Sequence, residues 1–177
     1  TARAEVIREK GTNRSQFFRG EVDKYTWVDV CSSYLPGEVI AAFLYAQMET
    51  AEKITGMRRT LWNEYHTGFA GLALSRPILP PIYAVPSECE HNAHMYYLLV
   101  GSEKERDELL GFLKKQGVMA VFHYVPLHNS PAGKIYSRCS GRLVNTERLS
   151  RTLLRLPIYP GFNGVERVVE LVQKFYY

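Results

Sequence analysis

A strand–helix–strand pattern in the second half of the chain constrains the fold more than any other feature. The run HMYYLLV at 94–100 combines aromatic and aliphatic residues and ends before a glycine, which predicts a strand. A helix follows, because Ser102 and Glu105 have the spacing of a capping box and leucines recur on one face after them. Gly117 ends this helix, and the run VMAVFHYV at 118–125 predicts a second strand.

Two more helices are expected between the second strand and the C-terminus. Residues 126–137 are expected to form a loop. Asn145 or Thr146 caps a short helix through Leu153, and the segment from 164 to 175 predicts a last helix with valines on one side. A turn-rich link joins these two helices. Together these elements predict a small α/β sandwich, in which helices cover one face of a short sheet.

The first half of the chain predicts helices around an irregular arm. Residues 2–10 have a helical rhythm that ends at Gly11. Residues 13–34 are aromatic and basic without a clear period, so we expect an extended, ordered arm with a functional or interface role. Apolar residues then recur at three- and four-residue steps from 37 to 74, which predicts a long helix or a broken pair, weakest at Gly56. A proline-rich connector follows.

Composition bounds the class of protein. A chain of 177 residues that is 46% hydrophobic buries roughly 70% of its unfolded surface, which favours one globular unit. The formal net charge of +4 suits an anionic ligand such as a phosphate ester but is too mild for a nucleic-acid-binding protein. Three cysteines without a C-x-x-C pair predict reduced thiols and a cytoplasmic location. No apolar run reaches the length of a membrane span.

The densest group of residues with binding chemistry lies where the second predicted strand ends. It contains His123, Tyr124 and His128, and ligands of α/β proteins commonly bind beyond strand ends. An imidazole and a phenol in this place can donate hydrogen bonds to phosphate oxygens or to sugar hydroxyls. In the alternative interpretation, some of these side chains point into the core and bond to the backbone. The residues alone leave both interpretations open.

Other groups of residues point to chemistry less directly. The arm carries three cations among its aromatic residues, namely Arg14, Arg19 and Lys24. They could bind an anion or a neighbouring subunit, or they could belong to a solvated loop. A zinc site built on His91 and His94 together with His123 and His128 is disfavoured, since no cysteine or carboxylate stands at a conventional spacing. The chain contains no nucleophile elbow, dinucleotide-binding fingerprint or P-loop.

Four segments of the chain together resemble one protein family. Their sequences are REKGTNRSQFFRGEVDKYTW at 8–27, SSYLPGEVIAAFLYAQME at 32–49, NAHMYYLLV at 92–100 and FHYVPLHNSPAG at 122–133. Taken together, they are similar to the C-terminal part of the pyridoxal-phosphate aminotransferases of the DegT/DnrJ/EryC1/StrS family, which act on nucleotide-linked keto sugars. The similarity runs from about Ala4 to the C-terminus, and the run at 8–20 is its most specific part.

The resemblance implies a fold and a reaction. Residues 1–35 would form the end of the large domain of a fold-type-I aminotransferase, including an extended interface arm. Residues 36–75 would form a long linking helix. Residues 76–177 would form a small α/β domain, with a short, largely antiparallel sheet and helices on one face. The protein would be a homodimer with active sites between subunits. Glutamate would aminate pyridoxal 5'-phosphate, and the cofactor would then aminate C4 of a TDP-4-keto-6-deoxyhexose for cell-surface polysaccharides.

The resemblance also assigns roles to individual residues. Ser33 stands where many members hold an asparagine that reaches the cofactor phosphate of the partner subunit, so we expect it to bind the cofactor. His123 and Tyr124 match positions that contact the nucleotide diphosphate of the substrate. Arg19 and Lys24 are further candidates for that contact. No metal ion is expected.

No lysine of the chain matches the one that holds the cofactor in this family. That lysine lies upstream, and none of the eight lysines here has its sequence context. The chain begins at Thr1 rather than Met and within a helical pattern, so we expect a piece of a longer protein that is inactive alone. Two alternatives stay open, namely a stand-alone module that binds sugar nucleotides and a structural module that dimerises without catalysis.

Overall fold

The computed structural model describes residues 2–75, 86 and 88–177 of a chain that divides into two compact units, Thr1–Ala51 and Glu52–Tyr177. The division falls inside the segment that was expected to be one linking helix, and the domain boundaries expected above stay predictions. Most of the proline-rich connector lies outside the described residues. Within the described ranges, none of the helices is both long enough and apolar enough to cross a membrane.

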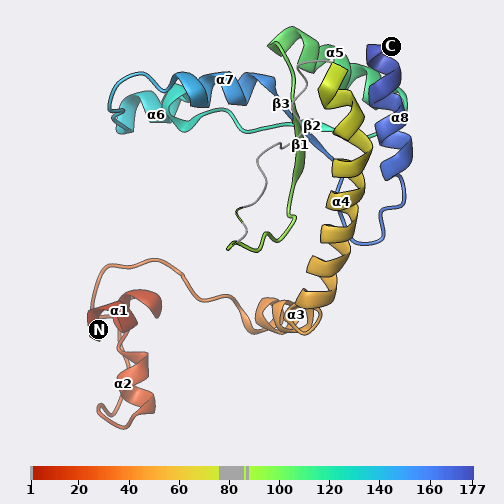
Figure 1. The fold of residues 1–177 in the computed structure, drawn as a ribbon. Coiled ribbons are helices and arrows are strands. Elements are labelled where there is room, and N and C mark those ends of the chain that lie inside the picture. The colour runs from red at the N-terminus through yellow and green to blue at the C-terminus, as the bar shows by residue number, and fades with distance from the viewer. Residues whose placement is uncertain (1, 76–85, 87) are drawn as a thin grey trace. The chain divides into compact units, whose positions relative to one another are not determined.

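The second unit is built on a three-stranded antiparallel sheet with the strand order β1–β3–β2 (Figure 1). Its strands are β1 (Tyr96–Leu99), β2 (Val121–Phe122) and β3 (Leu153–Leu156). β1 pairs with β3 over its whole length, with Tyr96 opposite Leu156, and Phe122 of β2 lies opposite Leu154. The short antiparallel sheet that the resemblance implied is therefore present.

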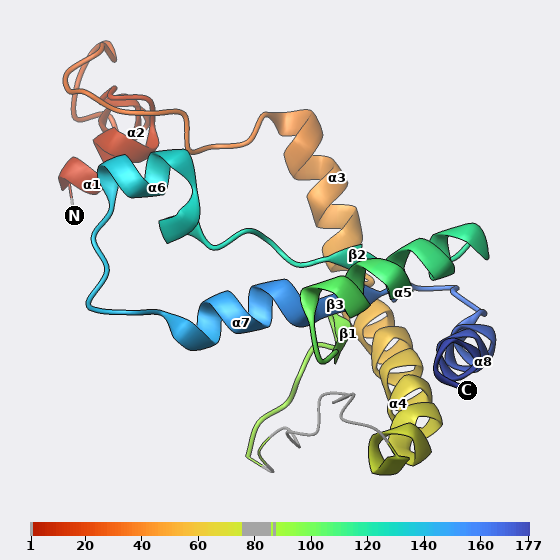
Figure 2. The same cartoon turned by 90° about the horizontal axis from the view of Figure 1, so that it is seen from above.

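Helices cover one face of this sheet (Figure 2). The helical segments of the unit are α4 (Ala51–Ser75), α5 (Glu103–Lys115), η1 (Leu127–Asn129), α6 (Pro131–Tyr136), α7 (Val144–Thr152) and α8 (Val165–Tyr176). Because side chains alternate between the faces of a strand, Tyr96 and Leu98 share a face with Leu154 and Leu156 across the ladder. All four are buried against apolar residues of α4, α5 and α8, which form one core with them.

The local signals around α5 are confirmed. The Ser102 Oγ accepts a hydrogen bond from the Glu105 N–H at 3.2 Å, and the Glu105 carboxylate accepts one from the Gly101 N–H at 2.9 Å. Gly117 has a φ of +77°, the left-handed conformation that favours glycine after a helix. The two ends of α8 also lie within one residue of the prediction.

Other predictions for the second unit are wrong. The second strand is confined to β2 and does not extend over 118–125, and Asn145 and Thr146 lie inside α7 rather than capping it. The expected loop at 126–137 contains η1 and α6, and the side chain of Ser130 caps the first turn of α6. β3 was assigned to the end of α7 and the link after it, because a short apolar run directly after a helix carries no strand periodicity.

The first unit contains α1 (Ala2–Arg8), α2 (Arg14–Phe18) and α3 (Glu38–Met48). The arm is therefore not extended throughout. The Glu9 carboxylate accepts hydrogen bonds from the N–H of Ser15 at 2.8 Å and from its hydroxyl at 2.7 Å, which fixes the first turn of α2 and lowers the pKa of Glu9. Isolated bridges join Glu9 to Ser33 and Thr12 to Trp27, so the rest of the arm folds back on the end of α1.

The long helical segment is a broken pair. α3 and α4 are separated at Glu49 and Thr50, where the N–H and the hydroxyl of Thr50 both donate to the Gln47 carbonyl. Gly56, the expected weak point, lies inside α4. A glycine inside a helix costs about 1 kcal/mol relative to alanine, and the burial of Leu61 and later residues of α4 in the core outweighs that cost.

Gly11→Ala should destabilise the first unit more than Gly20→Ala does. Both glycines have a φ of +73°, which costs a residue with a Cβ about 1–2 kcal/mol. A Cβ at Gly11 would also overlap the Asp29 carbonyl oxygen, whereas one at Gly20 meets no atom within 4 Å. Hydrogen exchange of the amides of Val28 and Asp29, which donate to the Gly11 carbonyl, measures the difference. Equal loss of protection in the two variants would contradict the packing argument.

Candidate functional site

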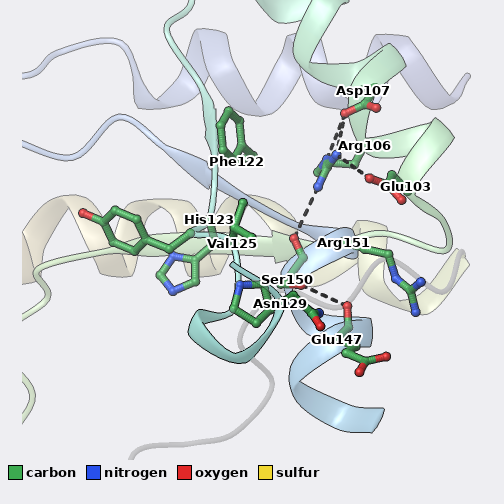
Figure 3. Close-up of a pocket in the computed structure, with 12 residues that line it drawn as sticks. Glu103, Arg106, Asp107, Phe122, His123, Val125, Asn129, Glu147, Ser150 and Arg151 are labelled. Carbon is green, nitrogen blue, oxygen red and sulfur yellow. Dashed lines mark hydrogen bonds and ion pairs between the residues drawn. The ribbon is translucent and has the colours of Figure 1, made fainter. Parts of the chain in front are cut away.

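A cavity of about 410 Å³ lies beside the end of β2 in the second unit (Figure 3). α5 contributes Glu103, Arg106 and Asp107 to its wall, and α7 contributes Glu147, Ser150 and Arg151. The residues that leave β2, including His123 and Tyr124, complete the wall together with Asn129 of η1. The structure therefore places His123 and Tyr124 of the predicted strand-end group in the wall of one cavity, whereas His128 does not line it.

His123 is half-buried in this wall. Its ring stands edge to face with Tyr124, with 5.3 Å between the centroids, and its buried Nδ1 has no hydrogen-bond partner among the described residues. Burial lowers the pKa of His123, and the positive charge of Arg155 lowers it further, so the ring is neutral at pH 7. A neutral imidazole offers one donor and one acceptor, and it can therefore bond to a hydroxyl or to a phosphate.

The alternative interpretation was that some of these side chains point into the core. Tyr124 and His128 differ in this respect. Tyr124 is exposed and lines the cavity, so it does not point into the core. The side chain of His128 is mostly buried, and its Nε2 lies 3.5 Å from a carboxylate oxygen of Glu147 without forming a hydrogen bond. Across the described ranges, histidine, cysteine and acidic side chains form no group of three that could hold a metal ion.

Arg106 is the buried cation of the site. Its guanidinium donates to Asp107 at 2.8 and 3.0 Å, to Glu103 at 3.4 Å and to the Ser150 carbonyl at 3.3 Å (Figure 3). Two carboxylates therefore compensate its charge, and its donors are used within the protein. Arg106 joins α5 to α7 and leaves little positive charge for a ligand.

Arg151, unlike Arg106, is an exposed cation. It lines the cavity, and its side chain forms no hydrogen bond or ion pair within the described part of the chain. Sequence reasoning missed it, although its spacing of four residues from Glu147 on a helix places both on one face. With Glu103, Asp107 and Glu147 also present, the cavity has mixed charge rather than a strongly positive surface.

The other predicted site residues belong to the first unit. Arg19 forms ion pairs with Glu21 at 2.7 Å and with Glu5 at 3.2 Å, and these bonds raise its pKa above the ordinary value. Lys24 is exposed, and Ser33 is exposed in its bridge to Glu9. These three residues belong to a different unit from the cavity, and their expected roles stay predictions.

Known proteins are similar to this chain over half of its length or more. The sequence profile of the DegT/DnrJ/EryC1/StrS aminotransferase family matches residues 1–173. The dTDP-3-amino-3,4,6-trideoxy-alpha-D-glucose transaminase of Streptomyces venezuelae is 30% identical over 141 residues, which are 78% of this chain and 35% of that protein. The pleiotropic regulatory protein of Geobacillus stearothermophilus is 30% identical over 98 residues, which are 54% of this chain and 26% of that protein.

Solved structures share the fold. The crystal structure of S. venezuelae DesV in complex with a ketimine intermediate superposes with a TM-score of 0.77 at 27% identity, over 96% of this chain and 42% of that one. The aminotransferase TlmJ from Streptoalloteichus hindustanus has a TM-score of 0.78 at 21% identity, over 97% of this chain and 43% of its own. The chain thus spans less than half the length of these relatives. It belongs to the DegT/DnrJ/EryC1/StrS aminotransferase family.

Proposed function

We propose that this chain is the C-terminal part of a pyridoxal-phosphate aminotransferase that moves an amino group from glutamate to C4 of a TDP-4-keto-6-deoxyhexose. The product would enter cell-surface polysaccharides such as enterobacterial common antigen or lipopolysaccharide. The match to the family over residues 1–173 supports the reaction class, and relatives named as dTDP-sugar transaminases support the substrate class. The observation that carries the proposal is the cavity at the end of β2, which joins His123 and Tyr124 to an unpaired arginine.

The cavity suits a sugar nucleotide better than a simple anion. Arg151 can contact one phosphate of the diphosphate, because no carboxylate holds its guanidinium. The neutral ring of His123 and the phenol of Tyr124 can each add one hydrogen bond. Carboxylates such as Glu147 would repel a bare anion but accept hydrogen bonds from sugar hydroxyls. In this proposal the chain binds and orients the substrate.

The chain offers a hydroxyl for the phosphate of pyridoxal 5'-phosphate but no lysine suited to its aldehyde. Ser33 is exposed, and its hydroxyl bonds to no group within the described part of the chain, so it can donate to the cofactor phosphate. All eight lysines are exposed and none lines the cavity, whereas a lysine that reacts with an aldehyde is usually desolvated. The cofactor, when bound, supplies the electron sink for amino transfer. We therefore assign its lysine to another part of the full-length protein.

α3 supports the proposal that the protein is a homodimer. Apolar residues occur on all sides of this helix, and none of its residues is buried within the first unit. The large exposed side chains are Val39, Ile40, Phe43, Leu44, Tyr45 and Met48. Helices that are apolar all round are normally buried, so α3 requires a covering surface from a second subunit or from the rest of the protein.

Borohydride reduction of the full-length protein from the natural gene should place a pyridoxyl group on a lysine outside residues 1–177. Reduction fixes the cofactor to the lysine that holds it, and mass mapping of the peptides locates that lysine. Chain 1–177 alone should take up no pyridoxyl group and show no transaminase activity. An adduct on any of its eight lysines would overturn the assignment, and a natural protein without adduct would favour the stand-alone binding module.

Arg151→Gln should weaken binding of TDP to the chain by about tenfold or more, since a hydrogen bond to a charged group contributes about 1.5–3 kcal/mol. Arg148→Gln is the matched control, because it removes the same charge from an exposed residue of α7 that does not line the cavity. Isothermal titration calorimetry measures both dissociation constants. Equal affinities in the two variants would show that TDP does not bind in this cavity.

A further inference from the structure

Arg155 stands beside the site without lining the cavity. It lies in the central strand β3, opposite Tyr97 of β1 and Val121 of β2. Because strand side chains alternate, it lies on the face of the sheet opposite to Leu154 and Leu156, which are buried in the core. Arg155 is half-buried, and its Nε is buried without a hydrogen-bond partner in the described part of the chain. An arginine in the middle of a small sheet requires an explanation, because burying its charge is costly.

The guanidinium of Arg155 contacts the residues on both sides of His123. Its Nη2 donates a hydrogen bond to the Phe122 carbonyl at 3.3 Å. Its Cζ lies 5.4 Å from the centroid of the Tyr124 ring, within the range of a cation–π interaction. One side chain therefore fixes the backbone before His123 and the ring after it.

We propose that Arg155 is a positioning residue of the candidate substrate site, which sets the orientation of His123 through its contacts with Phe122 and Tyr124. The inference rests on the proposed function, in that the cavity is taken as the nucleotide-sugar site. Arg155 belongs neither to the sequence motif at 122–133 nor to the residues that line the cavity. The substrate would meet His123 as a neutral hydrogen-bonding group beside a fixed aromatic ring.

Electrostatics support this role. Burial lowers the pKa of His123, and the charge of Arg155 acts in the same direction. The other charged or titratable groups around the cavity come from three elements: Glu103, Arg106 and Asp107 of α5, Glu147 and Arg151 of α7, and His128 of η1. Arg106 is compensated by its carboxylate partners. Among these cations, Arg155 is the one whose charge lowers the pKa of His123.

The sign of the pH dependence follows from these charges. At pH 7 the His123 ring is neutral, and it gains a proton only as the pH falls through its lowered pKa. A protonated ring has a second donor and a positive charge, so the affinity for TDP should rise at low pH. Arg155→Gln should raise the pKa of His123, and the gain in affinity should then begin at a higher pH.

The test combines a titration without ligand and a titration with ligand, both on the whole chain 1–177. NMR of the His123 ring gives its pKa in the parent chain, in Arg155→Gln and in Arg155→Lys. We expect an upward shift in Arg155→Gln but little shift in Arg155→Lys, which keeps the charge. Lys174→Gln, which removes an exposed charge from α8, should leave the His123 titration unchanged.

TDP binding distinguishes a positioning role of Arg155 from an effect of its positive charge alone. Arg155→Lys loses the planar group that lies over Tyr124, so its affinity for TDP at pH 7 should fall by about two- to fivefold, the effect of an exposed cation–π contact. An unchanged His123 titration in Arg155→Gln, or unchanged TDP affinity in Arg155→Lys, would overturn the inference. If no variant and no parent chain binds TDP while His123 titrates as expected, the proposed function fails and the link between Arg155 and His123 holds.

Discussion

The pairing of β3 with both of its neighbours is the interaction on which the second unit depends. β3 is only four residues long, yet it carries the hydrogen bonds to β1 on one side and to β2 on the other. Without it, the two strands predicted from the sequence would have no partner in the sheet. Its side chains Leu154 and Leu156 also complete the apolar face that α4, α5 and α8 bury. Both the sheet and the core of this unit therefore depend on β3.

The same strand couples the core to the candidate site. Arg155 lies between two leucines that are buried in the core, so its backbone position is fixed by the packing on the other face of the sheet. Its guanidinium then holds the carbonyl of Phe122 and the ring of Tyr124. A substitution that loosened the leucine packing would move a charge beside His123. Stability and the geometry of the candidate site are therefore linked through three consecutive residues.

The local signals around α5 were predictable from the sequence, and distant pairings were not. The cap of α5 and the left-handed Gly117 depend on residues within one turn, and both are present as expected. β3 escaped prediction because its four residues follow α7 without a turn and gain their strand structure only from partners more than 30 residues away. His123 and Tyr124 could be named as candidates because they follow a predicted strand, whereas Arg151 and Arg155 come from later elements that the fold brings back to the same place.

The three arginines around the site have different effects because their surroundings differ. Arg106 is buried and paired with two carboxylates, so it holds α5 against α7. Arg155 is half-buried beside a neutral imidazole and an aromatic ring, so its charge acts on His123. Only a cation with no internal partner can exchange water for a ligand phosphate without breaking an existing ion pair. Among the arginines that line the cavity in the described chain, Arg151 meets that condition, so the anionic part of a ligand should bind at the α7 side.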